Sequence, residues 1–247
     1  NLYRQYPPPF AWMEQYNYRH TRYVLAANAD AAGVLRRKGY AGPAAVFPQF
    51  GVDTELFVPR PHPAGAPLRI GYVGRLRPEK GVELLVRAFA PMASRAELII
   101  LGRGPTEPEL RALAQRLNIA GRVHFMGGLE SGQVATSMAS LDILVLPSLT
   151  QSNWTEQFGR VLVEAMACAV AVVGSSAGEI PHVIADAGLI FPEGDVAALR
   201  GCLERLLDDP TLRAELARTG RAHALAHYAQ DLIAAQTYAA WQAMLAG

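Results

Sequence analysis

The chain has 247 residues, enough for one large domain or for one domain with part of another. Hydrophobic residues make up 51% of it, which suffices for a core, and the formal charge is +1. The net charge therefore gives no indication that the chain binds nucleic acid or an anionic membrane surface.

The cysteines and the start of the chain indicate the compartment in which the protein resides. Cys168 and Cys202 have neither metal-ligand spacing nor a disulfide framework, so we interpret them as small core residues in a reducing cytoplasm. No apolar run has the length of a membrane-spanning helix, and the start does not resemble a signal peptide. Because Asn1 is not an initiator methionine, we expect a fragment or a processed chain.

Residues 1–67 differ in pattern from the rest. An aromatic-rich stretch, 10–23, is followed by a short strand at 23–27, a helix that begins at Asp30, and a second strand at 44–48. Pro59, Pro61, Pro63, Gly65 and Pro67 then predict a stiff, extended linker.

A regular alternation begins at Leu68. Six apolar runs predict strands, at 68–73, 97–101, 123–126, 143–146, 170–174 and 188–191. Most are rich in Val, Ile and Leu, as in parallel strands covered on both faces. The helical patterns between them have their apolar positions at Val82, Leu85, Val86 and Phe89, at Leu110, Leu113, Ala114 and Leu117, and at Val196, Leu199, Cys202, Leu203 and Leu206.

Asp195 is a candidate N-cap for the last of these helices, and the tail after Pro210 is helical and rich in alanine. The alternation predicts an α/β fold with a doubly wound, Rossmann-like parallel sheet over residues 68–210. Ligands of such sheets bind beyond the carboxyl ends of the strands, so the loops there are the places to look for a site.

The loop after the first strand of the sheet runs from Gly74 to Gly81 and carries Arg75 and Lys80. A helix start favours anions, and two cations beside it form a candidate diphosphate clamp. Arginine offers a bidentate fork and lysine a point charge. The loop is neither a Walker loop nor Gly-x-Gly-x-x-Gly, and the competing interpretation is a pair of surface charges.

Two further loops are weaker candidates. Gly102-Arg103-Gly104 follows the second strand and is either a ligand loop or a plain turn. The stretch from His124 through Met126 to Gly128 could present backbone groups to the edge of a nucleobase.

Glu156 and Glu164 lie eight residues apart around the start of an apolar helix. Gly159 suits the tight turn into that helix, which places Glu156 in the preceding loop and Glu164 in about the second turn. A carboxylate among apolar residues is costly to bury unless something hydrogen-bonds to it, and a sugar or ribose diol can do so. The alternative is a pair of surface glutamates, which the apolar surroundings disfavour.

In this order, the motifs resemble the carboxyl-terminal half of a group 1 (family 4) glycosyltransferase of the GT-B fold. The matching motifs are Gly74-Arg75-Leu76, Lys80-Gly81, Gly102-x-Gly104, Phe125-x-Gly127, Pro147-Ser148, Glu156-x-Phe158-Gly159, Glu164-Ala165-Met166-Ala167-Cys168 and Gly178-Glu179-Ile180-Pro181. The resemblance divides the chain into the end of an amino-terminal domain with the interdomain linker (1–67), a nucleotide-sugar-binding domain (68–210) and carboxyl-terminal helices (211–247).

The resemblance implies a retaining transfer of a hexose from a nucleoside-diphosphate sugar, a UDP- or GDP-sugar, to an acceptor hydroxyl, with no metal and no other cofactor. It implies that Arg75 and Lys80 bind the diphosphate, that Glu156 binds the transferred sugar and that Glu164 binds the ribose. Further donor contacts implied by it come from Gly74, Gly102, Phe158, Gly159, Arg160 and Val161, and from the backbone near His124 and Met126 for the base.

The sequence departs from the family pattern at several points. Ala169 and Ala171 stand where the family usually has Gly and Pro, and His182 replaces a frequent glutamate. The family's amino-terminal domain is missing apart from its last elements, so we expect exposed aromatic side chains such as Tyr3, Phe10, Trp12 and Tyr16. They would be disordered or would pack against a second copy.

The missing half also shapes the functional expectation. We expect a cytoplasmic chain that binds a sugar nucleotide but is inactive alone, because the acceptor, a glycan, lipid or small molecule, needs the amino-terminal domain as a partner. The parent enzyme could associate peripherally with a membrane. The alternatives are a non-catalytic nucleotide-sugar-binding module and an epimerase or phosphorylase on the same fold.

Overall fold

A computed structural model describes residues 5–61, 65–128 and 130–246. The chain forms two compact units, one made of residues 1–51 and 228–247 and the other of residues 52–227. The linker beyond residue 51 belongs to the larger unit, in which Val52 and Phe57 are buried. These units begin and end at other residues than the predicted domains. None of the helices in the described residues is long and apolar enough to cross a bilayer.

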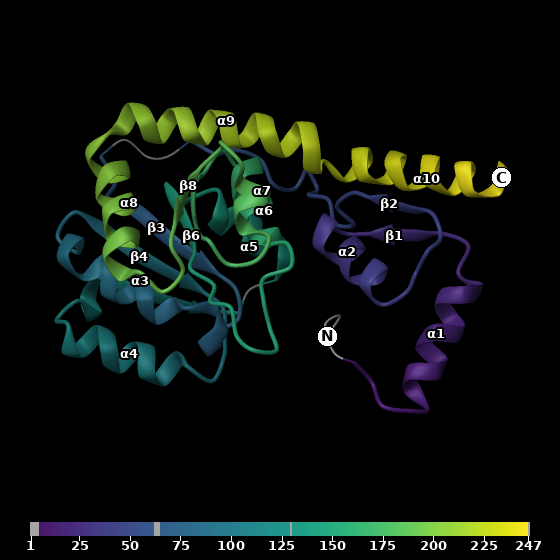
Figure 1. Cartoon of the computed structure of the whole chain (residues 1–247). Helices are drawn as coiled ribbons and strands as arrows, with labels where there is room; N and C mark the ends of the chain where they lie inside the picture. Colours follow the sequence, from purple (N-terminus) through teal and green to yellow (C-terminus); the bar gives the residue numbers. More distant parts are fainter. Residues whose placement is uncertain (1–4, 62–64, 129, 247) are drawn as a thin grey trace. The chain divides into compact units, whose positions relative to one another are not determined.

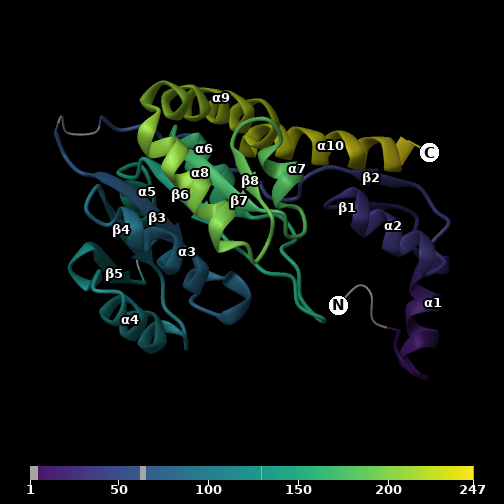
Figure 2. The same ribbon diagram turned by 60° about the vertical axis from the view of Figure 1, so that its left-hand side comes forward.

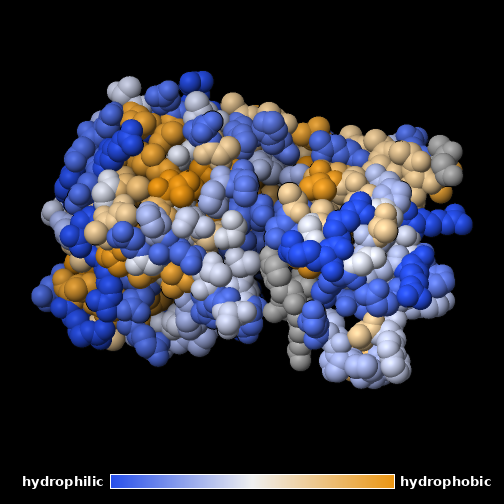
Figure 3. All heavy atoms as spheres, viewed as in Figure 1, coloured by the Kyte–Doolittle hydropathy of each residue, from blue (hydrophilic) through white to orange (hydrophobic). Residues whose placement is uncertain are grey.

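The described residues of the smaller unit form two parallel strands and three helices. Its elements are α1 (Phe10–His20), β1 (Val24–Ala26), α2 (Ala29–Arg37), β2 (Ala44–Val46) and α10 (Gln230–Ala246). Helix α2 begins at Ala29 and not at the predicted Asp30, with Asn28 as its N-cap, because the Asn28 Oδ1 accepts a hydrogen bond from the amide of Ala31 at 2.7 Å. Helix α1 was not predicted, since its exposed aromatic residues and its polar inner contacts invert the usual pattern of a surface helix. Apolar side chains line parts of α10 (Figure 3).

Helix α1 attaches to α2 and the turn after it through polar side chains. The carboxylate of Glu14 lies 2.6 Å from the Lys38 ammonium, and the Gln15 amide donates to the Lys38 carbonyl at 2.8 Å. The ring of Tyr18 meets the edge of the buried Tyr40 ring.

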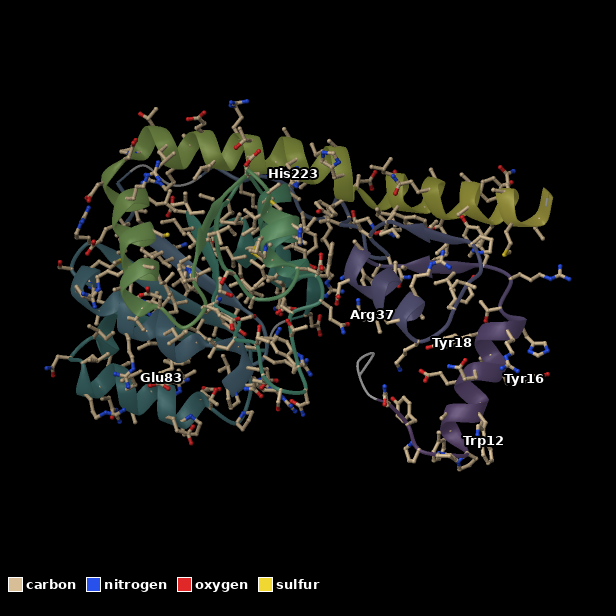
Figure 4. The ribbon with its side chains drawn as sticks, viewed as in Figure 1. Trp12, Tyr16, Tyr18, Arg37, Glu83 and His223 are labelled. Carbon is tan, nitrogen blue, oxygen red and sulfur yellow. The ribbon has the colours of Figure 1, made fainter. Side chains whose placement is uncertain are left out.

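Trp12 and Tyr16 lie on the side of α1 that faces away from Tyr18 (Figure 4). Phe10, Trp12 and Tyr16 are 60%, 70% and 62% exposed, which confirms their expected exposure, whereas Tyr3 lies outside the described residues. They belong to a regular helix and not to a disordered segment. Within this unit the helix therefore turns its polar side inward and its apolar side outward.

The larger unit is an α/β layer structure (Figures 1 and 2). Its strands are β3 (Leu68–Val73), β4 (Ala96–Leu101), β5 (Val123–Gly127), β6 (Ile143–Leu146), β7 (Ala171–Ser175) and β8 (Leu189–Phe191). Its α-helices are α3 (Val82–Phe89), α4 (Glu107–Arg116), α5 (Ser131–Met138), α6 (Arg160–Ala167), α7 (Ile180–Ile184), α8 (Val196–Asp208) and α9 (Pro210–Tyr228). Its described residues also form the 3-10 turns η1 (Pro78–Lys80), η2 (Ala90–Met92) and η3 (Ala120–Arg122).

The six strands pair in parallel in the order β5-β4-β3-β6-β7-β8. Helix α3 packs against α4 and α8, and α6 packs against α5 and α7, so that the two groups cover opposite faces of the sheet (Figure 2). The predicted α/β class with a doubly wound, Rossmann-like parallel sheet is confirmed.

The core follows the predicted apolar pattern. All four residues of β6 are buried, as are Val82, Leu85, Val86 and Phe89 of α3. Asp195 caps α8 by accepting from the amide of Ala198 at 2.9 Å. Cys168 is buried, which raises the pKa of its thiol to about 12, whereas Cys202 is only half-buried.

The strand order positions the site. Successive crossovers run outward from β3 in one direction and from β6 in the other, and β3 and β6 are neighbours. The loops after these two strands therefore border the crevice at which doubly wound sheets bind their ligands.

Candidate functional site

The loop after β3 carries an exposed cation, Arg75, and a cation in an ion pair, Lys80. Tyr72 is fully buried, and its phenol donates to the Arg75 carbonyl at 2.8 Å. Burial raises the pKa of that phenol, which keeps it a donor. Arg75 itself is exposed, and its guanidinium makes no ion pair with any described residue. Gly81, at φ 63°, then starts α3 so close to the next loop that a Cβ atom would lie 2.0 Å from the Pro147 carbonyl oxygen.

Lys80 and Glu156, which are 76 residues apart in the sequence, form an ion pair across this crevice. The Lys80 Nζ lies 2.6 Å from the Glu156 Oε2, and the two side chains are only 13% and 12% exposed. The hydroxyl of Ser148, a fully buried residue, donates to the same Oε2 at 2.9 Å. The Lys80 Nζ also lies over the Trp154 ring, 4.6 Å from its centroid.

Ser148 and Trp154 were not predicted to belong to the site. Ser148 belongs to the Pro147-Ser148 motif that follows the fourth strand of the sheet, and its place at a strand end was the available signal. A lone tryptophan in a loop gives no such signal.

Hydrogen bonds within the loop after β6, residues 147–156, and from it to the elements around it fix its path. They join Leu149 N to Glu79 O (2.8 Å), Thr150 Oγ1 to Glu193 Oε2 (2.8 Å), Gln151 N to Trp154 O (2.8 Å) and Glu179 N to Glu156 O (3.0 Å). In addition, a Cβ atom on Gly178 would lie 2.0 Å from the Glu156 carbonyl oxygen. The loop is therefore a fixed arch that holds the Glu156 and Trp154 side chains over Lys80.

Glu164 lies in the second turn of α6, as predicted. Gly159, at φ 76°, begins the helix, and the Arg160 Nε lies 2.9 Å from the Glu164 Oε1. Burial raises the pKa of Glu164, and the charge and hydrogen bond of Arg160 oppose that rise. Glycine at the start of both α3 and α6 leaves the first-turn amides without a side-chain cap. The amides of Leu84 and Leu162 donate to the carbonyls of these glycines, and the amides before them can bind an anion.

The loops after β3, β4 and β5 stack on one another through backbone hydrogen bonds. The bonds run from Gly74 N to Leu101 O (2.9 Å), from Leu76 N to Arg103 O (3.0 Å) and from Gly102 N to Gly127 O (2.8 Å). A Cβ atom on Gly102 would lie 1.8 Å from the Gly74 carbonyl oxygen, and one on Gly104 would lie 2.0 Å from that of Leu76. The predicted Gly102 loop is thus part of the wall of the crevice.

The remaining predicted residues are spread along the edge of the sheet. Met126 is 53% exposed near the carboxyl end of β5, and Phe158 and Val161 flank the start of α6, both half-buried. The His124 ring instead points toward the strand β4, where its Nε2 lies 3.6 Å from the Glu97 Oε1. The donor contacts of these four residues stay predictions.

The arrangement places three cations, two carboxylates that are each paired with one of them, and two helix starts without a side-chain cap around the ends of β3 and β6. Cations and amides of this kind bind phosphate, and carboxylates accept hydrogen bonds from hydroxyl groups. In the part of the chain that the structure describes, no group of three or more His, Cys, Asp or Glu side chains is arranged to hold a metal ion.

The family described as glycosyl transferases group 1 matches residues 55–223. The chain belongs to this family. A GDP-mannose-dependent monoacylated alpha-(1-6)-phosphatidylinositol monomannoside mannosyltransferase of Corynebacterium glutamicum is 36% identical over 165 residues, which cover 64% of this chain and 43% of that protein. A D-inositol 3-phosphate glycosyltransferase of Acidothermus cellulolyticus is 36% identical over 199 residues, covering 71% of this chain and 43% of that protein.

Solved structures of similar proteins share the fold. Sucrose-phosphate synthase from Thermosynechococcus elongatus has a TM-score of 0.81 at 28% identity, covering 98% of this chain and 63% of that one. The C-terminal domain of the group 1 protein LpcC from Francisella tularensis has a TM-score of 0.65 at 25% identity, covering 73% of this chain and 100% of that one. The predicted resemblance to the carboxyl-terminal half of a GT-B glycosyltransferase is confirmed. The chain spans about half the length of the curated relatives it matches.

Proposed function

We propose that this chain is the donor-binding half of a retaining glycosyltransferase that moves a hexose from a UDP- or GDP-sugar to an acceptor hydroxyl. The observation that carries the proposal is the Lys80–Glu156 pair at the point where the strand order reverses, beside the uncapped starts of α3 and α6. The mannosyltransferase relative from Corynebacterium glutamicum is named as GDP-mannose-dependent, which supports a sugar nucleotide here.

In this proposal the cations of the β3 loop bind the diphosphate. Arg75 is exposed and free of ion pairs among the described residues, so its planar guanidinium can take two phosphate oxygens. Lys80 supplies a point charge at the start of α3. Negative charge develops on the departing diphosphate during transfer, and fixed cations and amides stabilise it without reorganising. A metal ion is then not required for that step, so the activity should survive a chelator.

The two carboxylates divide the hydroxyl groups of the donor between them. Glu156 lies in the arch and accepts hydrogen bonds from hydroxyl groups of the transferred sugar, whereas Glu164 lies in α6 and accepts them from the ribose. The backbone of Gly74, Gly102 and the α6 start would contact the phosphates and the sugar. The backbone near His124 and Met126 would contact the base.

The acceptor belongs to the other half of the enzyme. The chain spans about half the length of its curated relatives, which supports the expectation that it binds the donor but does not transfer sugar alone. A cleft reaction needs a facing wall that excludes water and orients the acceptor, and an error of about 1 Å can cost about a hundredfold in rate. The exposed aromatic side of α1 is consistent with a missing neighbour. The alternative function, a nucleotide-sugar-binding module without catalysis, makes the same binding predictions and differs only in a transfer assay with the amino-terminal half added.

Calorimetric titration of single variants tests the clamp. Arg75→Ala and Lys80→Ala should each weaken nucleoside-diphosphate binding about tenfold or more, since a charge-assisted hydrogen bond contributes about 1.5–3 kcal/mol. Binding of the nucleoside alone should not change. Arg77→Ala is the matched control, because it removes an exposed cation from the same loop. Equal losses for nucleoside and diphosphate, or an equal loss in Arg77→Ala, would show that the clamp is wrongly assigned.

A further inference from the structure

The groups assigned to two different parts of the donor bind each other. Lys80 is assigned to the diphosphate and Glu156 to the transferred sugar, and their side chains form a 2.6 Å ion pair that is largely shielded from water. A diphosphate that recruits the Lys80 ammonium must therefore compete with the Glu156 carboxylate. The cost of that competition depends on what Glu156 receives in exchange.

A shielded carboxylate that loses its cation is strongly disfavoured unless other donors replace it. Ser148 still donates to the Glu156 Oε2 at 2.9 Å, but one neutral donor does not compensate for the lost cation. The hydroxyl groups of a donor sugar would supply the missing hydrogen bonds. A free nucleoside diphosphate has no such hydroxyl groups at that position, so it would leave Glu156 uncompensated.

Resting on the proposed function, we propose that the Lys80–Glu156 ion pair is an exchange switch that makes the site prefer the sugar nucleotide over the nucleoside diphosphate. Binding of the donor exchanges the pair for two contacts, ammonium to phosphate and sugar hydroxyl to carboxylate. Transfer removes the sugar, Glu156 again competes for Lys80, and the nucleoside diphosphate keeps its contact with Lys80 only at the cost of leaving Glu156 without a cation. The pair thus promotes release of the product that shares the donor's phosphates.

The surroundings of the pair let one side chain move while the other stays. Glu156 is in the arch, whose backbone is hydrogen-bonded on both sides, and Ser148 holds the same carboxylate oxygen that faces Lys80. Lys80 has a flexible side chain, and the Trp154 ring lies against its ammonium at 4.6 Å. The ring attracts the cation by a cation–π interaction in either arrangement, so it keeps Lys80 near the crevice while the partner changes.

The test compares nucleoside diphosphate with sugar nucleotide in calorimetric titrations of the 247-residue chain, using UDP with UDP-glucose and GDP with GDP-mannose. In Glu156→Gln the amide cannot hold Lys80 as an anion does. We expect the nucleoside diphosphate to bind about tenfold more tightly, the scale of one charge-assisted hydrogen bond. The sugar nucleotide should gain nothing or bind more weakly. Inorganic pyrophosphate, which has neither base nor sugar, should also bind more tightly.

Glu79→Gln is the matched control. It removes one negative charge from the residue before Lys80 without touching the pair, since the Glu79 carboxylate lies 4.0 Å from the Arg77 guanidinium. For this variant, the ratio of the dissociation constants of the nucleoside diphosphate and the sugar nucleotide should equal that of the parent chain. Glu156→Ala serves as the second variant if the amide replaces the carboxylate as a partner of Lys80, and it should shift the ratio in the same direction.

Three outcomes would overturn the exchange switch. The switch is wrong if both Glu156 variants weaken the sugar nucleotide and leave the nucleoside diphosphate and pyrophosphate unchanged, because Glu156 is then a sugar contact only. If Glu79→Gln binds the nucleoside diphosphate more tightly to the same extent, the loss of any nearby negative charge explains the result and the exchange switch is wrong. If the parent chain binds no nucleotide at all, the proposed function fails first, and the switch fails with it.

Discussion

Ala169 occupies a left-handed backbone conformation directly after α6, where the family usually has glycine. Its φ is 55°. Its amide donates to the Met166 carbonyl at 2.9 Å, and the amide of Val170 donates to the Ala165 carbonyl at 3.0 Å. This pair of bonds is a Schellman motif, which requires the left-handed residue at this position. We therefore predict that Ala169→Gly stabilises the chain.

The expected gain is the difference between two opposing effects. The left-handed conformation costs an L-residue about 1–2 kcal/mol, and glycine removes that cost. Glycine loses more conformational entropy on folding than alanine, which lowers the free energy of unfolding by about 0.4–1 kcal/mol. Ala169 lines a cavity of about 230 Å³, so removing its methyl group loses little packing. The net gain in the free energy of unfolding should be about 0.5–1 kcal/mol, or a rise in Tm of about 1–4 °C for a chain of this length.

Thermal and urea denaturation of the parent and variant chains measure this change. Ala167→Gly is the control, because Ala167 is a buried helical residue of α6 with no positive φ. That variant should lose about 1 kcal/mol or more through helix propensity and the lost methyl group. If Ala169→Gly lowers the Tm or leaves it unchanged while the control behaves as expected, the argument from backbone strain is wrong.

Two further predictions concern single residues. Ala185 has φ 47° and ψ −127°, and the amide of Ala187 donates to the Ile184 carbonyl at 2.9 Å. This geometry is a turn that favours glycine at its first central position, which Ala185 occupies. Ala185→Gly should therefore raise the urea midpoint of unfolding, and an unchanged midpoint would count against this prediction. The raised pKa of Glu164 means that the folded chain binds a proton more readily than the unfolded chain, so stability should rise as the pH falls from neutral toward about 4.5. Glu164→Gln should remove that part of the pH dependence, as measured by urea denaturation at several pH values, and identical pH profiles would refute the assignment.

The sequence was sufficient for the fold of the larger unit because its strands are continuous apolar runs and its helices carry a clear apolar stripe. The runs at 68–73 and 143–146 match β3 and β6 at both ends. Helix α5 was missed because its eight residues are mostly small or polar, with Val134 and Met138 as its large apolar residues. Helix α7 was missed because five residues are too few to show a helical period. Helix α1 was missed for a different reason, because its exposed side is aromatic and its inner side polar, which inverts the usual pattern.

The sequence placed Lys80 and Glu156 at the same edge of the sheet but could not show that they touch. Their contact depends on the path of the arch after β6, which long-range hydrogen bonds determine. Likewise, the apolar helix showed that Glu164 would need a partner, and the structure gives it Arg160, one turn earlier in the same helix. Side-chain direction also decided the place of the His124 ring, since a strand pattern does not say which neighbour a ring meets.

The stacked glycine loops also limit how this half can be recombined with its relatives. The loop that carries Arg75 rests on Gly102 and Gly104, whose neighbour Arg103 supplies a carbonyl to it, and Gly102 in turn hydrogen-bonds to Gly127. A relative's loop spliced in alone would arrive without the backbone groups against which it is shaped, and a single added side chain would collide with a carbonyl. Chimeras that exchange donor preference should therefore carry all three loops as one cassette.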